Sequence, residues 1–221
     1  MHKRLFVTGT DTEVGKTVVS RGLLQTLATD GKHAVGYKPV AKSSQQTEEG
    51  PRNKDALVLQ ASSSLQLPYQ AINPVTLLDD EISTSLQSFS YSTLSRGLHA
   101  LDEQADYVVT EGTGGWRSLM SDRRPLSDWV VQEQMPVVLV VGIKLGCISH
   151  ALLTAQAILN DGLPLLGWVA NRINPGLAHY AEIINVLQDK IPAPLLGELP
   201  YLPRAETRDL SRYFDLSPLN L

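Results

Sequence analysis

Residues 9–17 read Gly-Thr-Asp-Thr-Glu-Val-Gly-Lys-Thr and follow a short apolar run, 5–8, that predicts a strand. Apolar side chains then recur at helical spacing over 16–29. A strand, a glycine-containing turn and a helix that begins at Gly-Lys-Thr are the features of a Walker A loop. Such a loop binds phosphates through backbone N–H groups, a lysine and a hydroxyl that can hold Mg²⁺. Five residues separate Gly9 from Gly15, one more than in the common pattern, so we predict a nucleotide-binding loop of lengthened form.

Short apolar runs alternate with helical patterns over most of the remaining chain. Strands are expected at 34–38, 106–111, 137–141, 165–171 and 194–199, and helices at 149–160 and 177–188. This alternation predicts the α/β class, in which a mostly parallel central sheet is flanked by helices on both faces, as in P-loop NTPases. The stretch 60–97 is rich in Ser, Thr and Gln and weakly periodic, so we expect an excursion from the sheet. We expect residues 1–221 to form a single domain.

The composition is that of an ordinary globular protein and excludes disordered or fibrous structure. The 221 residues are 43% hydrophobic and 19% charged, with a formal net charge of −4. The negative charge argues against binding to nucleic acid or to an anionic membrane. The N-terminus lacks the apolar region of a signal peptide, no stretch approaches the roughly 20 apolar residues of a membrane span, and the chain has one cysteine. These features predict a cytoplasmic protein.

Charged residues follow or end the predicted strands. Lys38 closes the second strand, Asp55 lies in the helical stretch after it, and Glu111 closes the third strand. Ligands of parallel sheets bind beyond the carboxyl ends of the strands. Thr17, Asp55 and Glu111 would therefore suit Mg²⁺, which prefers oxygen ligands and shares phosphate oxygens. For Asp55, a solvated charge on a helix surface is an equally good interpretation, whereas a carboxylate at the end of an apolar strand is costly to bury without a cation.

Six stretches together resemble the dethiobiotin synthetase family of ATP-dependent carboxylases. They are residues 9–17, 36–40 (Gly-Tyr-Lys-Pro-Val), 52–57 (Arg-Asn-Lys-Asp-Ala-Leu), 111–116 (Glu-Gly-Thr-Gly-Gly-Trp), 146–150 (Gly-Cys-Ile-Ser-His) and 167–171 (Gly-Trp-Val-Ala-Asn). They occur in family order over nearly the whole chain, and the lengthened loop is the family's own form. The resemblance identifies the chain as a member of this family or as a divergent second copy of it.

The resemblance implies a reaction and its partners. An amine of 7,8-diaminononanoate combines with CO₂ to give a carbamate, the carbamate attacks the γ-phosphate of ATP, and the mixed anhydride closes onto the second amine as a cyclic urea. The resemblance also implies Mg²⁺, a role in biotin biosynthesis and a homodimer. A related enzyme acting on a different amine or carboxylate, or a nucleotide-dependent switch ATPase, are the alternatives. Switch ATPases of this architecture carry a second lysine early in the loop, where this chain has Thr10 and Asp11.

By the same resemblance, three residues would be catalytic: Lys16 on the β- and γ-phosphates, Lys38 on the carbamate and the transferring phosphate, and Thr12 on substrate and phosphate. The residues implied to bind nucleotide and its metal are Glu13, Val14, Gly15, Lys16, Thr17, Val18, Asp55, Glu111, Gly112, Thr113, Gly114, Asn171, Arg172, Pro200, Tyr201 and Leu202. Among them Asn171 would read adenine, with the last three lining the base pocket, although the segment 200–202 is equally typical of a plain surface loop.

The substrate carboxylate is implied to meet the N-terminus of the helix after the fourth strand, often from the partner subunit. Here that segment contains Gly146, Cys147 and Ser149. A helix N-terminus suits an anion, and we expect Ser149 to be the N-cap, with or without a ligand. Cys147 is interpreted as a small packed residue, because no activating base is identifiable beside it.

Three departures from the family pattern concern the substrate. Lys42 stands where the family has a hydroxyl residue that touches the diamine, Ser149 replaces an asparagine, and Thr113 replaces an alanine. A cation at Lys42 would repel a protonated diamine but could favour a carbamate or a second carboxylate. The departures touch neither the P-loop nor the expected metal ligands, so they bear on the substrate and not on ATP or Mg²⁺. From its position in the family pattern, Lys42 is expected to contact substrate.

Overall fold

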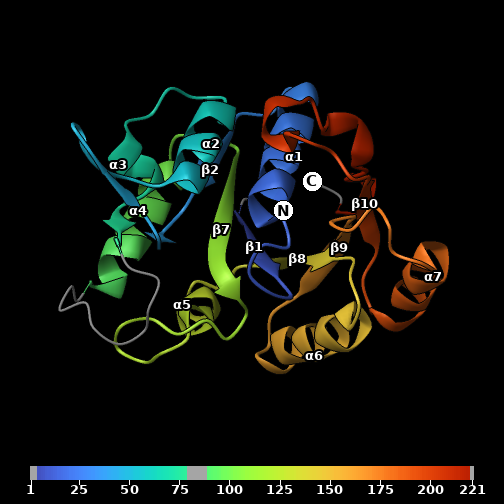
Figure 1. Ribbon diagram of the computed structural model, residues 1–221. Coiled ribbons are helices and arrows are strands. Elements are labelled where there is room, and N and C mark those ends of the chain that lie inside the picture. The colour runs from blue at the N-terminus through green and yellow to red at the C-terminus, as the bar shows by residue number, and fades with distance from the viewer. Residues whose placement is uncertain (1–3, 79–88, 220–221) are drawn as a thin grey trace.

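A six-stranded parallel sheet forms the centre of the computed structural model, which describes residues 4–78 and 89–219 (Figure 1). The strand order is β10-β9-β8-β1-β7-β2. The strands are β1 (Arg4–Gly9), β2 (Ala34–Tyr37), β7 (Tyr107–Gly115), β8 (Val137–Gly142), β9 (Leu165–Asn171) and β10 (Leu195–Leu199). All five strand pairings in this sheet are parallel, which confirms the predicted class.

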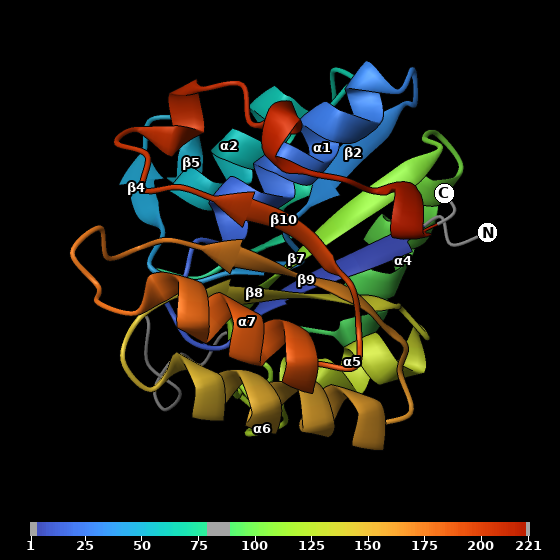
Figure 2. The same ribbon diagram turned by 90° about the vertical axis from the view of Figure 1, so that its right-hand side faces the viewer.

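Helices cover both faces of the sheet, as Figures 1 and 2 show. The helices are α1 (Lys16–Thr29), α2 (Lys54–Ser62), α3 (Tyr69–Ile72), α4 (Tyr91–Asp102), α5 (Leu126–Gln132), α6 (Cys147–Asn160) and α7 (Tyr180–Lys190). Three 3₁₀ turns follow near the C-terminus, Ala205–Thr207, Ser211–Tyr213 and Ser217–Leu219. One face packs against α1 and α2, and the other against α4 to α7.

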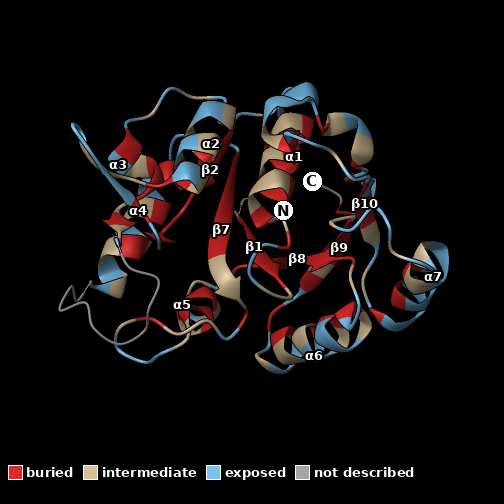
Figure 3. Cartoon of the chain, viewed as in Figure 1, coloured by how far each residue is buried: buried red, intermediate tan, exposed pale blue. Residues whose placement is uncertain are grey.

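The two cores follow from the alternation of side chains along the strands. In β1, Leu5 and Val7 belong to the cluster under α1, whereas Phe6 belongs to the cluster on the opposite face. In β8, all six residues are buried, because the strand lies inside the sheet with helices on both faces (Figure 3). The continuous apolar run predicted for this strand therefore reflects burial on both sides.

Two small sheets lie outside the central one. β3 (Val40–Ala41) pairs in parallel with β6 (Val75–Thr76), and β4 (Gln45–Thr47) forms an antiparallel hairpin with β5 (Gly50–Arg52). The stretch 60–97 contains the end of α2, then α3, β6 and the first part of α4, so the expected excursion from the central sheet is confirmed for its described residues; 79–88 lie outside them.

Several sequence-based boundaries were wrong. β7 runs on to Gly115, because a register shift lets it pair with β1 as far as Gly9; Glu111 therefore lies inside a strand rather than at its end. The helix expected from residue 149 begins at Cys147 with Gly146 in the left-handed conformation as its N-cap (φ 82°), so Ser149 is not the cap. The last helix begins at Tyr180 instead of residue 177. Helix α5, which follows Pro125, was not predicted.

Candidate functional site

The loop between β1 and α1 is shaped by two glycines. A Cβ atom at Gly9 would lie 2.5 Å from Val14 Cγ2. Gly15 has φ 93°, and a Cβ there would lie 2.1 Å from Asn171 Nδ2. Both positions therefore require glycine. Val14 is fully buried beneath the loop, so its side chain is not available to a ligand. The predicted contact of Val14 with nucleotide can involve only its backbone.

Lys16 extends back over this loop. Its Nζ donates to the carbonyl oxygen of Asp11 at 3.1 Å. Burial, with a further contribution from the nearby charge of Lys38, lowers the pKa of Lys16 to about 8 despite the opposing effect of the surrounding carboxylates. The Asp11 carboxylate accepts from Lys144 Nζ at 2.8 Å and from the Thr12 N–H at 2.8 Å. Those hydrogen bonds keep the pKa of Asp11 below its usual value and tie the loop to the segment after β8.

Lys38 connects the two predicted acidic residues. Its Nζ lies 2.7 Å from Glu111 Oε1 and 3.5 Å from Asp55 Oδ2, and it also donates to the Gly112 carbonyl at 2.9 Å. The Lys38 side chain is 3% exposed and that of Glu111 is 0% exposed. Burial lowers the pKa of Lys38, but Glu111 and Asp55 outweigh it and hold the pKa above its ordinary value. Lys38 therefore stays an ammonium.

The same group of residues fits a Mg²⁺ ion. Thr17 Oγ1 donates to Glu111 Oε1 at 2.9 Å, which places the hydroxyl and the carboxylate side by side. Glu111 Oε2 is buried and has no hydrogen-bond partner among residues 4–78 and 89–219. The side chain of Asp55 is 45% exposed and lines a cavity. A buried unpaired oxygen is costly unless a donor or cation meets it, and oxygen donors of this kind suit Mg²⁺.

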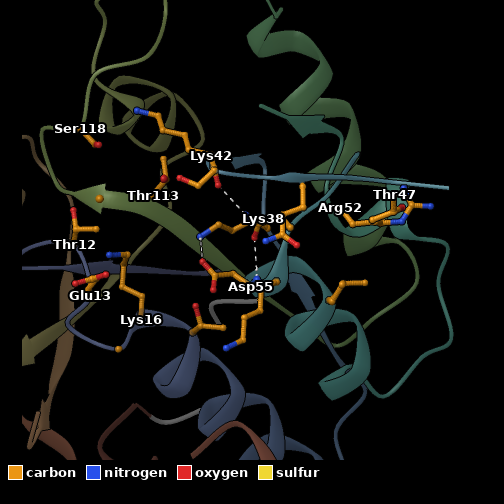
Figure 4. A pocket seen from close by; sticks show the side chains of 18 residues that line it. Thr12, Glu13, Lys16, Lys38, Lys42, Thr47, Arg52, Asp55, Thr113 and Ser118 are labelled. Atoms are coloured by element: carbon orange, nitrogen blue, oxygen red, sulfur yellow. Dashed lines mark hydrogen bonds and ion pairs between the residues drawn. The ribbon is translucent and has the colours of Figure 1, made fainter. Parts of the chain in front are cut away.

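Thr17, Lys38 and Asp55 line a cavity of about 980 Å³ (Figure 4), whereas the fully buried Glu111 is not among its lining residues in the described part of the chain. Its lining includes the predicted residues Thr12, Glu13, Gly15, Lys16, Thr17, Lys38, Lys42, Asp55, Thr113 and Gly114. The lining residues for which no role was predicted are Ser43, Gln45, Thr47, Arg52, Asn53, Lys54, Leu57 and Ser118. Most of these come from the β4–β5 hairpin and the start of α2, and an Arg-Asn-Lys run before a helix was the only signal in the sequence. Figure 4 shows Lys38 between the P-loop side chains and the hairpin.

Lys42 borders this cavity after β3. Its Nζ donates to the carbonyl of Leu119 at 3.0 Å, so the ammonium lies near the turn that follows β7. Thr113 and Ser118 line the same part of the cavity in Figure 4. The three side chains thus form one polar wall of the cavity.

A second, smaller cavity of about 160 Å³ gathers the residues predicted for the base. It is lined by Val18, Asn171, Arg172, Ile173, Leu199, Pro200, Tyr201, Leu202 and Ala205. Asn171 Nδ2 donates to the Val14 carbonyl at 2.9 Å, which fixes the amide against the P-loop. Tyr201 is half exposed at the rim. The cavity therefore lies beside the loop, where the base of a bound nucleotide would be expected.

The N-terminus of α6 does not reach either cavity in this chain. Gly146, Cys147 and Ser149 are absent from both linings among the described residues. Ser149 is exposed, whereas Cys147 is buried and its N–H donates to the Lys144 carbonyl. Cys147 is thus a packed residue as predicted. A role for this helix in binding substrate would require a second subunit.

Comparison with known proteins assigns the family. The sequence model described as AAA domain matches residues 3–208. The chain is 69% identical over 220 residues to ATP-dependent dethiobiotin synthetase BioD 2 of Salmonella typhimurium, covering 99% of this chain and 95% of that one. It is 67% identical, with the same coverage, to the protein of that name in Escherichia coli K12. The chain belongs to the dethiobiotin synthetase family. Against Vibrio parahaemolyticus dethiobiotin synthetase BioD, identity is 52%, with 97% of this chain and 96% of that one covered.

Solved structures confirm the fold of this dethiobiotin synthetase family member. The MinC:MinD cell division complex of Aquifex aeolicus superimposes with a TM-score of 0.63 at 13% identity, covering 95% of this chain and 85% of that one. A ParA family ATPase from Chlorobium tepidum gives 0.59 at 14% identity, covering 99% and 100%. At these identities the likeness concerns the fold alone, which is that of P-loop NTPases.

Family membership confirms the expectation of an ATP-dependent ligase in biotin biosynthesis over that of a switch ATPase. An enzyme of this kind acts on small molecules. Among the described residues, no helix combines the length and apolar character needed to cross a bilayer.

Proposed function

We propose that the chain, as one P-loop domain, carboxylates and cyclises 7,8-diaminononanoate to dethiobiotin with CO₂ and ATP. The observation that carries the proposal is the ion-paired group of Lys38, Glu111 and Asp55, of which Lys38 and Asp55 line a cavity that also contains Lys16. Phosphoryl transfer needs positioning and stabilisation of charge. The site suits this reaction, because it brings together two cations, two carboxylates and a phosphate-binding loop.

The reaction follows from the chemistry of the two amines. One amine attacks CO₂ and loses a proton, giving a carbamate. A carbamate oxygen then attacks the γ-phosphorus of ATP, the bond to ADP breaks, and a carbamic-phosphoric anhydride forms. The second amine attacks the carbonyl carbon and loses a proton, phosphate departs, and the cyclic urea closes. ATP cleavage thereby removes an oxygen that would otherwise leave as hydroxide.

Each cation has a distinct place in this scheme. Lys16, next to the loop backbone, binds the β- and γ-phosphates. Lys38 remains protonated beside its two carboxylates and stabilises the carbamate and the charge on the transferring phosphoryl group. Thr12 lies at the rim of the cavity and contacts both substrate and phosphate.

Thr17, Asp55 and Glu111 would hold Mg²⁺. When bound, the ion neutralises phosphate charge and aligns the oxygens of the transfer. Glu111 is the most buried of the three, and its unpaired Oε2 favours this assignment. In the second cavity, Asn171 and the segment Pro200–Leu202 hold adenine, with Glu13, Arg172 and Val18 beside the nucleotide.

We also propose a homodimer that brings α6 of one subunit to the cavity of the other. Leu145, which precedes α6, is 84% exposed, and Leu153, on the surface of α6, is 63% exposed. Exposed leucines of this size are typical of a surface covered by a partner. The substrate carboxylate would then meet the N–H groups at Gly146 and Cys147 of the partner's helix, with Ser149 beside them. A role in biotin biosynthesis and the use of ATP also favour a cytoplasmic location.

The position of Lys42 favours a second candidate substrate, an amine or carbamate that carries an additional carboxylate. A lysine on the cavity wall would bind such a group, and it would oppose a protonated diamine.

A direct assay tests the proposal. The purified protein is incubated with Mg²⁺, ATP, bicarbonate and 7,8-diaminononanoate, and products are identified by mass spectrometry. We expect dethiobiotin only when all four components are present. ATP binding without this product would keep the phosphate site and reject the substrate.

A further inference from the structure

Lys38 lies just beyond the end of its strand. The last residue of β2, Tyr37, pairs with Thr110 of β7, so Lys38 has no partner in the sheet ladder within the described residues. Its backbone is held instead by the last residue of α3 and the residue that follows it. The Lys38 N–H donates to the Ile72 carbonyl at 2.8 Å, and the Lys38 carbonyl accepts from Asn73 Nδ2 at 2.7 Å. The position of this lysine is therefore set by residues more than thirty positions later in the chain.

Asn73 is fully engaged by its surroundings. The residue is 2% exposed. Its Nδ2 also donates to the Val75 carbonyl at 3.0 Å, and its Oδ1 accepts from Thr76 Oγ1 at 2.8 Å and from the hydroxyl of Tyr69 at 2.9 Å. A buried amide with every bond satisfied holds its surroundings in one arrangement.

Tyr69 continues the connection toward Asp55. Its hydroxyl accepts the N–H of Asn53 at 2.8 Å while it donates to Asn73. Asn53 is the N-cap of α2, and its Oδ1 accepts from the Asp55 N–H at 2.9 Å. Asn53 Nδ2 donates to the Lys42 carbonyl at 2.8 Å. Asn53, Tyr69 and Asn73 thus connect the backbones of Lys38, Lys42 and Asp55.

We propose that the buried relay Asn73–Tyr69–Asn53 is a positioning device that holds Lys38 and Asp55 in register across the cavity. The inference rests on the proposed function, because it concerns the same site. None of the three relay residues bonds to the P-loop in the described structure. The relay therefore positions Lys38 and Asp55, at the end of the site where the phosphoryl group is transferred, and leaves the phosphate loop unaffected. It also assigns a role to α3 and to the start of the 60–97 stretch.

A pair of tyrosine variants separates positioning from stability. Tyr69→Phe removes one hydroxyl from the relay and keeps the ring under Arg52, which lies 4.4 Å above it. Tyr37→Phe is the control, because Tyr37 is also buried and its hydroxyl donates to the Leu94 carbonyl at 2.8 Å, away from the relay. Asn73→Ala is a stronger variant of the relay. Thermal denaturation, steady-state kinetics and ATP binding with and without Mg²⁺ are measured for each.

We expect Tyr69→Phe to lower kcat by about tenfold relative to Tyr37→Phe at a similar loss of Tm, since small misplacements of reacting groups cost this much or more. ATP affinity without Mg²⁺ should be unchanged, while the gain in affinity on adding Mg²⁺ should shrink, because Asp55 is displaced. Equal kcat values and an equal Mg²⁺ gain in the two tyrosine variants would overturn the proposal. If Asn73→Ala does not fold, the tyrosine pair decides alone.

The binding measurement separates this proposal from the proposed function. A wild-type protein that makes no dethiobiotin, but whose Mg²⁺ gain is reduced by Tyr69→Phe alone, would reject the substrate and support the relay. A wild-type protein that makes dethiobiotin, with no difference between the tyrosine variants, would support the function and reject the relay.

Discussion

The two lysines of the site lie in contrasting surroundings. Lys16 belongs to a loop whose backbone shapes it, is hydrogen-bonded to a carbonyl, and has a pKa lowered by burial to about 8. Lys38 is more deeply buried, but two carboxylates hold its pKa above the ordinary value. Among residues 4–78 and 89–219, no carboxylate forms an ion pair with Lys16 in the phosphate loop, so a bound phosphate would supply the opposite charge. The transfer end presents a cation already fixed by its partners. Binding and transfer should therefore respond differently to substitution.

The largest effect is expected from Lys38→Ala. We expect turnover to fall by about 10³-fold, because a charge that stabilises the transition state is lost, while ATP binding is retained. The measurement is single-turnover kinetics beside calorimetric ATP titration. The variant also leaves the Glu111 carboxylate buried without its cation, which costs about 3–5 kcal/mol. The double variant Lys38→Ala with Glu111→Gln should regain Tm but not turnover. Wild-type turnover in Lys38→Ala would remove this lysine from the mechanism.

Lys16→Gln should act on ATP binding. We expect ATP affinity to fall by about 10- to 100-fold, the cost of a lost charged hydrogen bond. Because the pKa of the free enzyme's Lys16 is about 8, ATP affinity of the wild type should decline as pH rises through that value, since binding then requires a proton. Lys16→Gln should show no such decline. Titrations between pH 7 and pH 9, roughly one unit either side of that pKa, check this, and a flat wild-type profile would contradict it.

Leu153→Glu sharpens the question of where the substrate is held. A charge on the exposed face of α6 should give a monomer by light scattering and raise the diamine KM by about tenfold, because the partner's helix no longer meets the carboxylate. The matched control is Ala28→Glu, an exposed position on α1 over the opposite face of the sheet. A monomeric wild type, or a monomeric variant with unchanged KM, would reject the shared site.

Lys42→Ser is expected to have the smallest effect. If the ammonium opposes a protonated diamine, its removal should lower the diamine KM by about two- to fivefold, in line with a partly screened charge near the surface. Turnover at saturation should change little. A raised KM would instead indicate that Lys42 binds an anionic part of the substrate and would favour the second candidate substrate.

The phosphate loop and the surroundings of Lys38 also differ in how much the sequence alone could predict. The P-loop was predictable because its glycines, lysine and threonine are adjacent in the chain, and the strands because they are apolar on both faces. Lys38 and Asp55 were identified from their positions at the end of the second strand and in the helical stretch after it, but their hydrogen bonds and ion pairs were not predictable. The relay depends on Tyr69 and Asn73, which lie in a stretch rich in polar residues and are buried only in the folded protein, where α3 packs against α2 and β2. Glu111 was placed at a strand end because its strand continues through a glycine-rich segment that resembles a turn.

The most direct test of the account is the ratio of ADP to dethiobiotin formed in one reaction, measured with and without 7,8-diaminononanoate. We predict one ADP for each dethiobiotin and negligible ADP release when the diamine is omitted, because in the proposed reaction the carbamate is the nucleophile that attacks the γ-phosphate. ADP release at the same rate without the diamine, or in large excess over dethiobiotin, would contradict the account.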